Sequence, residues 1–177
     1  MDIPFFYRNF PWIIVSAYVI FIYATLGYVR CLSDALRARG ILGIVTLAIL
    51  FLLCGTVITR LRRLSSLHSR MLIVLLLGIS VLSSLFLPFP EERLHVVEYG
   101  ILGWLLGWAL ARSGKWPAWW RGGVLLVWMI GYGDEIIQWF LPNRVFDVRD
   151  ILLNGIAGMV GLVIFAIFAK EASGKQS

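Results

Sequence analysis

The stretch ILLNGIAGMVGLVIFAIFA, residues 151–169, holds one polar side chain, Asn154, in nineteen consecutive positions. A helix that crosses the hydrocarbon core of a bilayer, roughly 30 Å thick, needs about 20 predominantly apolar residues. The stretch therefore predicts a transmembrane helix, and such a helix places the rest of the chain in or beside a membrane.

The composition of the whole chain agrees with a membrane setting. Its 177 residues are 60% hydrophobic and 15% charged, whereas a soluble domain is about 45–50% apolar and about 25% charged. The mean hydropathy is +0.86, and these values together exclude a water-soluble globule. Two cysteines are too few for a disulfide scaffold, and we expect Cys31 and Cys54 to be free, packed thiols at different depths.

Working outward from the last apolar run, five more precede it. All six are long enough to cross a bilayer as helices, and none shows the ten-residue alternation of a membrane β-barrel. We predict an all-α polytopic membrane bundle with about six transmembrane helices and no appended soluble domain. The runs cover residues 12–29, 41–59, 71–87, 95–111, 122–140 and 151–169.

The distribution of basic residues predicts the orientation. The two ends of the chain and the loops at 60–70 and 112–121 hold 10 Lys and Arg, and the three alternate loops hold 6. Cytoplasmic loops are enriched in Lys and Arg, so we expect both termini in the cytoplasm. The net charge of +6 then reflects topology, and nucleic-acid binding is excluded because the chain has no compact basic domain. Trp116, Trp119 and Trp120 beside Lys115 indicate an aromatic belt at the interface.

Acidic residues gather in two separate stretches. Seven of the ten lie within residues 91–98 and 134–150, and alternating helices carry both stretches to the side opposite the termini. In the first stretch, His95, Glu98 and Tyr99 follow at helical spacing and share a side of the fourth helix. The structural alternative is an ordinary amphipathic helix start, which suits Glu92. Arg93 follows Glu92 directly. Glu98 fits that alternative less well, because an intramembrane carboxylate is costly unless it has a partner.

The second stretch begins with adjacent carboxylates, Asp134 and Glu135. Each costs roughly 2.5–3.5 kcal/mol at membrane depth on insertion scales. Neighbouring helical positions diverge by about 100°, so the two need different partners. Glu135 shares a face with Gln138, and we take it as the better site candidate. The structural alternative is a buried ion pair with Arg144 or Arg149.

The loop before the sixth helix is rich in polar residues. Pro142 and Asn143 indicate a turn, and Asp150 is the expected N-cap of the helix. Asn154 follows Asp150 by one turn and lies at the head of a stripe with Gly158 and Gly161. Such a stripe allows close helix contact, and the sequence at 103–107, Gly-x-x-x-Gly, offers a matching surface on the fourth helix.

The ordered set of these residues resembles the VanZ-like family. Its pattern is an acidic-basic pair, His-x-x-x-aromatic, Asp-Glu-x-x-Gln, Pro-x-Arg, Asp-x-x-Asp, then Asn and Gly at four-residue steps. The resemblance covers residues 71–170 as a four-helix core, leaving two N-terminal helices in residues 1–70 and a polar tail at 171–177. The matching residues are Glu92, Arg93, His95, Tyr99, Asp134, Glu135, Gln138, Pro142, Arg144, Asp147, Asp150, Asn154 and Gly158.

This resemblance implies a multi-pass envelope protein of the bacterial inner membrane, in a family whose founding member is linked to teicoplanin resistance. It implies no established reaction. We expect one extracytoplasmic pocket in which Arg144 bridges carboxylates. The expected pocket residues are Glu92, Arg93, His95, Glu98, Tyr99, Asp134, Glu135, Gln138, Arg144, Asp147, Asp150 and Asn154.

Three functions remain open from the sequence. The pocket binds a membrane lipid or a lipid-linked or lipoglycopeptide amphiphile, or it is an enzyme site in which His95 acts as acid and base on a lipid headgroup, with Glu135 or Glu98 as its partner. The third possibility is an accessory subunit that docks other membrane subunits. No zinc motif, phosphate-binding loop or nucleophile elbow is present, and we expect no cofactor. A hard divalent cation is an alternative ligand, through Glu98, Glu135, Asp147 and Asp150.

Cysteine labelling tests the predicted orientation. With both termini cytoplasmic, Glu91→Cys and Asn143→Cys should react with a membrane-impermeant thiol reagent in intact cells, because both positions then face outward. Labelling that requires permeabilised cells would reverse the assignment.

Overall fold

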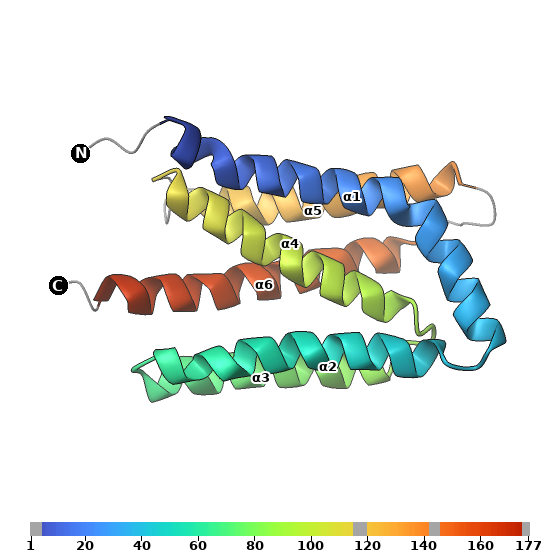
Figure 1. Cartoon of the computed structure of the whole chain (residues 1–177), viewed down its shortest axis with the longest axis horizontal. Coiled ribbons are helices and arrows are strands. Elements are labelled where there is room, and N and C mark those ends of the chain that lie inside the picture. The colour runs from blue at the N-terminus through green and yellow to red at the C-terminus, as the bar shows by residue number, and fades with distance from the viewer. Residues whose placement is uncertain (1–4, 115–119, 142–145, 175–177) are drawn as a thin grey trace.

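The computed structural model describes residues 5–114, 120–141 and 146–174, and these residues form helices with no strand. The predicted all-α class and six long helices are confirmed. α1 and α6 extend well beyond the predicted apolar runs. The helices are α1 (Phe5–Ala38), α2 (Leu42–Arg60), α3 (Leu67–Leu85), α4 (Glu92–Arg112), α5 (Trp120–Trp139) and α6 (Val148–Gly174), with a 3₁₀ turn at Leu61–Arg63 (Figure 1).

Five of the helices are long and apolar enough to cross a membrane: α1, α2, α3, α4 and α6. α5 has 20 residues but carries Arg121, Asp134 and Glu135, which lower its hydropathy. It runs beside α1 and α4 (Figure 1), which are both candidate spans. That α5 also crosses the membrane therefore stays a prediction. Exposed apolar side chains cover the outer faces of α2 and α3, including Leu52 at 70% and Ile44 at 71% exposure. Such surfaces are typical of helices that face lipid.

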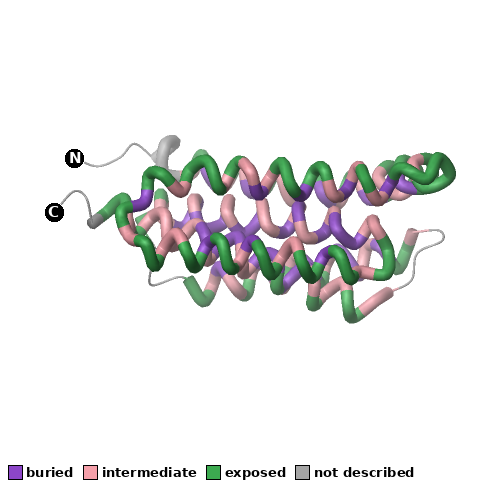
Figure 2. The backbone as a smooth tube through the Cα atoms, turned by 90° about the horizontal axis from the view of Figure 1, so that it is seen from below, coloured by how far each residue is buried: buried purple, intermediate pink, exposed green. Residues whose placement is uncertain are grey.

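α4 is the central helix of the bundle. It crosses α6, contacts α1 and α5, and has the highest buried share of the five candidate spans. The α2–α3 hairpin lies as a separate layer along α4 and α6 (Figure 1). Figure 2 shows the buried residues concentrated in the middle of the bundle, with exposed residues along its outer helices.

Glycines allow the backbones of α4 and α6 to touch. A Cβ added to Gly103 would lie 1.9 Å from the carbonyl oxygen of Gly158, and one added to Gly161 would lie 2.0 Å from that of Gly100. The predicted close contact between these two helices is therefore confirmed. Gly107, the second glycine of the predicted surface, meets the ring of Phe165 and not a glycine.

α1 is longer than a bilayer requires. Its 34 residues extend about 50 Å at 1.5 Å per residue, and the helix turns near its C-terminal end to lie across the end of the bundle (Figure 1). The part before the turn is fastened to α4 and α5: Tyr18 Oη donates to the carbonyl of Glu98 (3.1 Å) and Tyr23 Oη to that of Ile130 (2.7 Å). The start of α1 and the end of α6 lie at the opposite end of the bundle (Figure 1).

Two smaller expectations have mixed outcomes. Both cysteines are free thiols, but only Cys54 is packed, because Cys31 is exposed on α1. Of the predicted aromatic belt, Trp120 is exposed at the start of α5. The other belt positions, at 115–119, lie outside the described residues.

Substituting Gly103 tests the α4–α6 contact. Gly103→Ala must push the two backbones apart, and we expect it to destabilise the protein by about 1–3 kcal/mol, the usual range for overpacking. Gly78→Ala on α3 is the matched control, because nothing lies within 4 Å of a Cβ there. Thermal unfolding in detergent micelles measures both. Equal unfolding temperatures for the two variants would contradict the contact.

Candidate functional site

The polar residues that the sequence singled out lie at the end of the bundle opposite the termini. α4 begins there, α5 ends there and α6 begins there (Figure 1). These side chains are buried despite their charge, and we call them the polar cluster. Its most buried members are Asp134 (0% exposed), Glu135 (0%), Asn154 (0%), Gln138 (1%), Glu92 (6%) and His95 (6%).

His95 and Tyr99 of α4 face Asp134 of α5. Tyr99 Oη donates a 3.1 Å hydrogen bond to Asp134 Oδ2, and His95 Nδ1 lies 3.8 Å from the same oxygen. The spacing of four residues places both groups on one side of α4. A carboxylate beside a histidine ring nitrogen fixes the orientation of the ring. The carboxylate beside His95 Nδ1 is thus that of Asp134, whereas the sequence suggests Glu135 or Glu98 as the partner of His95.

Glu135 points to the segment that begins α6. Its Oε2 accepts a 3.0 Å hydrogen bond from the backbone amide of Asp147. The expectation that the two adjacent carboxylates take different partners is confirmed. The choice of Glu135 over Asp134 as the better site candidate stays a prediction; Asp134 is the residue that contacts the His95 and Tyr99 side chains.

Asp147, and not Asp150, caps α6. The helix begins at Val148, and Asp147 Oδ1 accepts a 2.8 Å hydrogen bond from the amide of Arg149. That contact satisfies one of the amides left open at a helix start. The prediction of Asp150 as N-cap is wrong, because the helix starts one turn earlier than the apolar run. Asp150 lies in the first turn, half-buried.

Glu92 and Arg93 diverge although they are adjacent. Glu92 pairs with Arg149 of α6 across 3.3 Å. Arg93 faces the α2–α3 hairpin, where its Nε donates to the carbonyl of Ser84 at 2.9 Å and its Nη1 lies 3.4 Å from that of Gly43. The structure therefore removes Arg93 from the polar cluster and gives it a role in attaching the hairpin.

Glu98 and His95 also border a crevice between α1 and α4. It is lined by Arg30, Ser33 and Glu91 at its outer part and by apolar α1 side chains deeper in. Its volume is about 20 Å³, which holds about one water molecule. Any larger group would need α1 to move away from α4.

Charged contacts hold the end of α1 over this crevice. Arg37 donates a hydrogen bond to Glu91, and Arg30 Nη1 lies 3.7 Å from the same carboxylate. Burial alone would raise the pKa of Glu91, but the Arg37 hydrogen bond and the two positive charges hold it below its usual value. The contact is therefore complete at neutral pH and is lost as pH falls through that lowered pKa. The sequence analysis missed these contacts between α1 and Glu91. The available signal was the spacing of Arg30 and Asp34, which are four residues apart and also form an ion pair.

Three buried side-chain amide atoms have no hydrogen-bond partner among the described residues. They are both polar atoms of Asn154 and the Nε2 of Gln138. Asn154 lies behind Tyr99, where a Cβ added to Gly131 would be 3.0 Å from Asn154 Cβ and 3.5 Å from Tyr99 Cε1. Buried amides without partners are rare in native proteins, because each loses its hydrogen bonds to water.

With this geometry in place, the chain can be compared with known families. The VanZ/LLP1 family model aligns with residues 7–169. The chain belongs to the VanZ/LLP1 family. The match includes α1 and α2, which the motif resemblance left outside its four-helix core. No curated protein and no solved structure matches the chain.

Within this VanZ/LLP1 protein, the structure brings most of the predicted pocket residues to one end of the bundle. Asp134, His95 and Tyr99 form one group and Glu135 with Asp147 a second, while Glu98 turns to α1. Arg144 and the turn at 142–143 lie outside the described residues. Among the described positions, no three His, Cys, Asp or Glu side chains are placed to hold a metal ion. The single shared pocket stays a prediction.

The N-cap assignment has a direct test. Asp147→Ala should lower stability by about 1 kcal/mol, because the Arg149 amide loses its acceptor, whereas Asp147→Asn keeps an acceptor oxygen and should stay near the unsubstituted protein. Thermal unfolding in detergent measures both. A loss of the same size in Asp147→Asn would assign the effect to charge and not to capping.

Proposed function

We propose that this VanZ/LLP1 protein binds the polar group of an envelope amphiphile, a lipid or a lipoglycopeptide, in the polar cluster. The observation that carries the proposal is the burial of Asp134 and Glu135, both 0% exposed, beside amides of Gln138 and Asn154 that no described residue satisfies. Buried ionisable groups at membrane depth are expensive and mark functional sites by default.

The charge of the cluster indicates the kind of group it would accept. The stretches at 91–98 and 134–150 hold seven acidic residues. In the described part, Glu92 pairs with Arg149, and Glu91 with Arg30 and Arg37. Deeper in, the carboxylates face histidine, tyrosine and amide groups. Such a surface suits hydrogen-bond donors, namely hydroxyl, amide or ammonium groups.

The crevice between α1 and α4 gives the ligand a route. It is lined by His95 and Glu98 together with apolar side chains of α1, and the charged contacts of Glu91 with Arg30 and Arg37 lie beside it. An amphiphile could place its polar group here while its apolar chain stays in the bilayer. Since the space holds about one water, binding would require the end of α1 to swing away.

Two alternatives remain. The pairing of His95 with Asp134 favours an enzyme that acts on a lipid headgroup, with His95 as acid and base and Asp134 as the group that orients it. The contacts across α4, α5 and α6 favour an accessory subunit, in which the cluster only joins helices.

Drug susceptibility in a Gram-positive host tests the proposal. Expression should shift susceptibility to teicoplanin more than to vancomycin, because only teicoplanin carries an acyl chain and each buried CH₂ adds about 0.8 kcal/mol of membrane anchoring. Asp134→Asn and Glu135→Gln keep the shape but remove the charge, and each should abolish the shift at unchanged protein level. Arg62→Gln, which removes an exposed charge at the opposite end of the bundle, is the control and should keep it.

The outcomes separate the alternatives. A full shift with both cluster variants would overturn the site. Loss of the cluster variants from the membrane, with no shift from the unsubstituted protein, would favour the accessory subunit. A chemically altered drug or lipid recovered only from cells with intact His95 would favour the enzyme.

A further inference from the structure

The α2–α3 hairpin is attached to the bundle by polar contacts at its two ends. At one end, Arg93 donates to the carbonyls of Ser84 and Gly43. At the other, Glu171 of α6 accepts hydrogen bonds from Ser65 and Ser69, with Oγ distances of 2.5 and 2.9 Å. These contacts fix the hairpin at both ends and leave its middle to apolar contacts alone.

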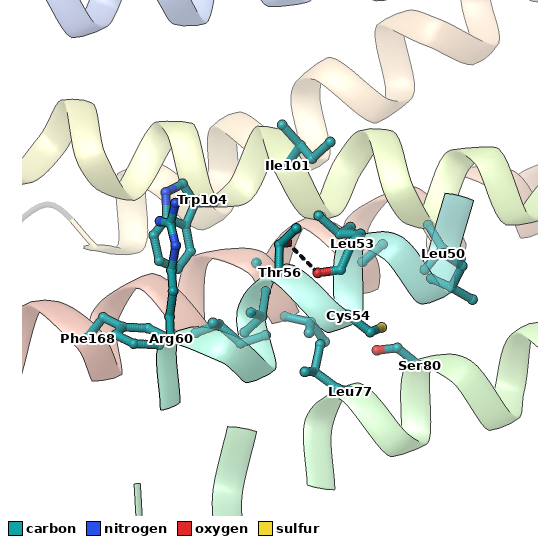
Figure 3. Close-up of a pocket in the computed structure, with 17 residues that line it drawn as sticks. Leu50, Leu53, Cys54, Thr56, Arg60, Leu77, Ser80, Ile101, Trp104 and Phe168 are labelled. Atoms are coloured by element: carbon teal, nitrogen blue, oxygen red, sulfur yellow. Dashed lines mark hydrogen bonds between the residues drawn. The ribbon is translucent and has the colours of Figure 1, made fainter. Parts of the chain in front are cut away.

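Between the two attachments lies a cavity of about 210 Å³. Side chains of α2, α3, α4 and α6 line it, and Figure 3 shows them pointing into one space. The lining is apolar except for Thr56, Ser80 and Arg60. For comparison, an engineered apolar cavity of about 150 Å³ stays dry and binds benzene. The space therefore suits an apolar group larger than one ring.

A single positive charge lies at one end of this cavity. Arg60 is the last residue of α2 and is exposed. It makes no salt bridge with any described residue, and Trp104 and Phe168 border the same end (Figure 3). Arg62 and Arg63 follow directly and are also exposed, so the surface around this end is basic. Basic residues near a bilayer surface attract anionic lipid.

We propose that this cavity binds one acyl chain of an acidic glycerophospholipid, with the lipid phosphate against Arg60. The apolar lining accounts for the chain, and the cation at the end accounts for the anionic headgroup. Arginine suits a phosphate because its planar fork donates two parallel hydrogen bonds. The site is separate from the polar cluster, which lies at the other end of the bundle, and it does not rest on the function proposed above.

The size of the space favours a lipid chain over a partner helix. A helix with its side chains is about 10–12 Å across, and the hairpin is fixed at both ends too closely to admit one. A second copy of this protein could insert only a side chain. That occupant would give a dimer, which the experiment distinguishes.

Native mass spectrometry of the full chain in detergent tests the site. The protein is titrated with phosphatidylglycerol and, separately, with phosphatidylcholine of the same acyl chains. We expect tighter binding of phosphatidylglycerol, weakened about fivefold by Arg60→Gln, which corresponds to about 1 kcal/mol for one basic residue at the membrane surface. Arg62→Gln removes the same charge outside the cavity and should weaken binding less than Arg60→Gln does, because its guanidinium does not line the cavity. Equal losses in the two variants would assign the effect to the basic surface and would overturn the role of Arg60.

Variants that fill the cavity test the acyl chain. Val57 lines the space from α2, whereas Ile58 is its exposed neighbour. Val57→Phe should remove binding of phosphatidylglycerol, and Ile58→Phe should keep it. Ser80→Leu fills the space from α3 and gives a second, independent variant should Val57→Phe fail to fold.

Three results would overturn the proposal: equal affinity for both lipids in the unsubstituted protein, undiminished binding in a folded Val57→Phe or Ser80→Leu variant, or a dimer that either variant dissociates while no lipid is bound. Because the readout is lipid affinity, failure here is distinct from failure of the drug-susceptibility experiment.

Discussion

The contact between the backbones of α4 and α6 is the constraint on which the rest of the structure depends. Gly103 rests on Gly158 and Gly161 on Gly100, so the two backbones are in direct contact at these positions. A bilayer provides little hydrophobic drive for helices to associate, and close packing has to supply it. This crossing brings the start of α4 to the start of α6, and α5, which connects them, must end at the same place. The polar cluster is assembled by that geometry.

The same crossing explains why the cluster can be buried. Asp134 and Glu135 on α5 would be unfavourable in lipid, but α4 offers Asp134 a tyrosine and a histidine, and the start of α6 offers Glu135 a backbone amide. Each carboxylate therefore joins α5 to a different neighbour. Structural and functional roles coincide at these two residues, which is why protein level has to be followed together with activity. Asn154 and Gln138 differ from these two carboxylates, because their unsatisfied amide atoms add no hydrogen bond to the described fold.

Hydropathy predicted the six helices because apolar length is a direct physical requirement of a bilayer. It missed the last turns of α1, because Arg30, Asp34 and Arg37 interrupt the apolar run while continuing the helix. The divergence of Asp134 and Glu135 was predictable, because neighbouring residues of an α-helix are rotated by about 100° around its axis. The same rule places Arg93 about 200° from His95 on α4, which should have separated Arg93 from the cluster. The choice between Asp147 and Asp150 as N-cap depended on the loop length, which residue types alone do not give. The cavity beneath the hairpin follows from tertiary packing and has no local signal.

The attachment of α1 has a consequence for biosynthesis. Its tyrosines donate to carbonyls of α4 and α5 that lie 80 and 107 residues further along the chain. At the usual 5–20 residues per second of synthesis, α1 leaves the ribosome roughly 5–20 seconds before α5 can accept Tyr23. During that interval its neighbours are the translocon, lipid and the newly made hairpin. We expect the apolar length of α1 to keep it inserted until the later helices arrive. Although α1 is made before α4 and α5, its packing against them is completed only after both have been made.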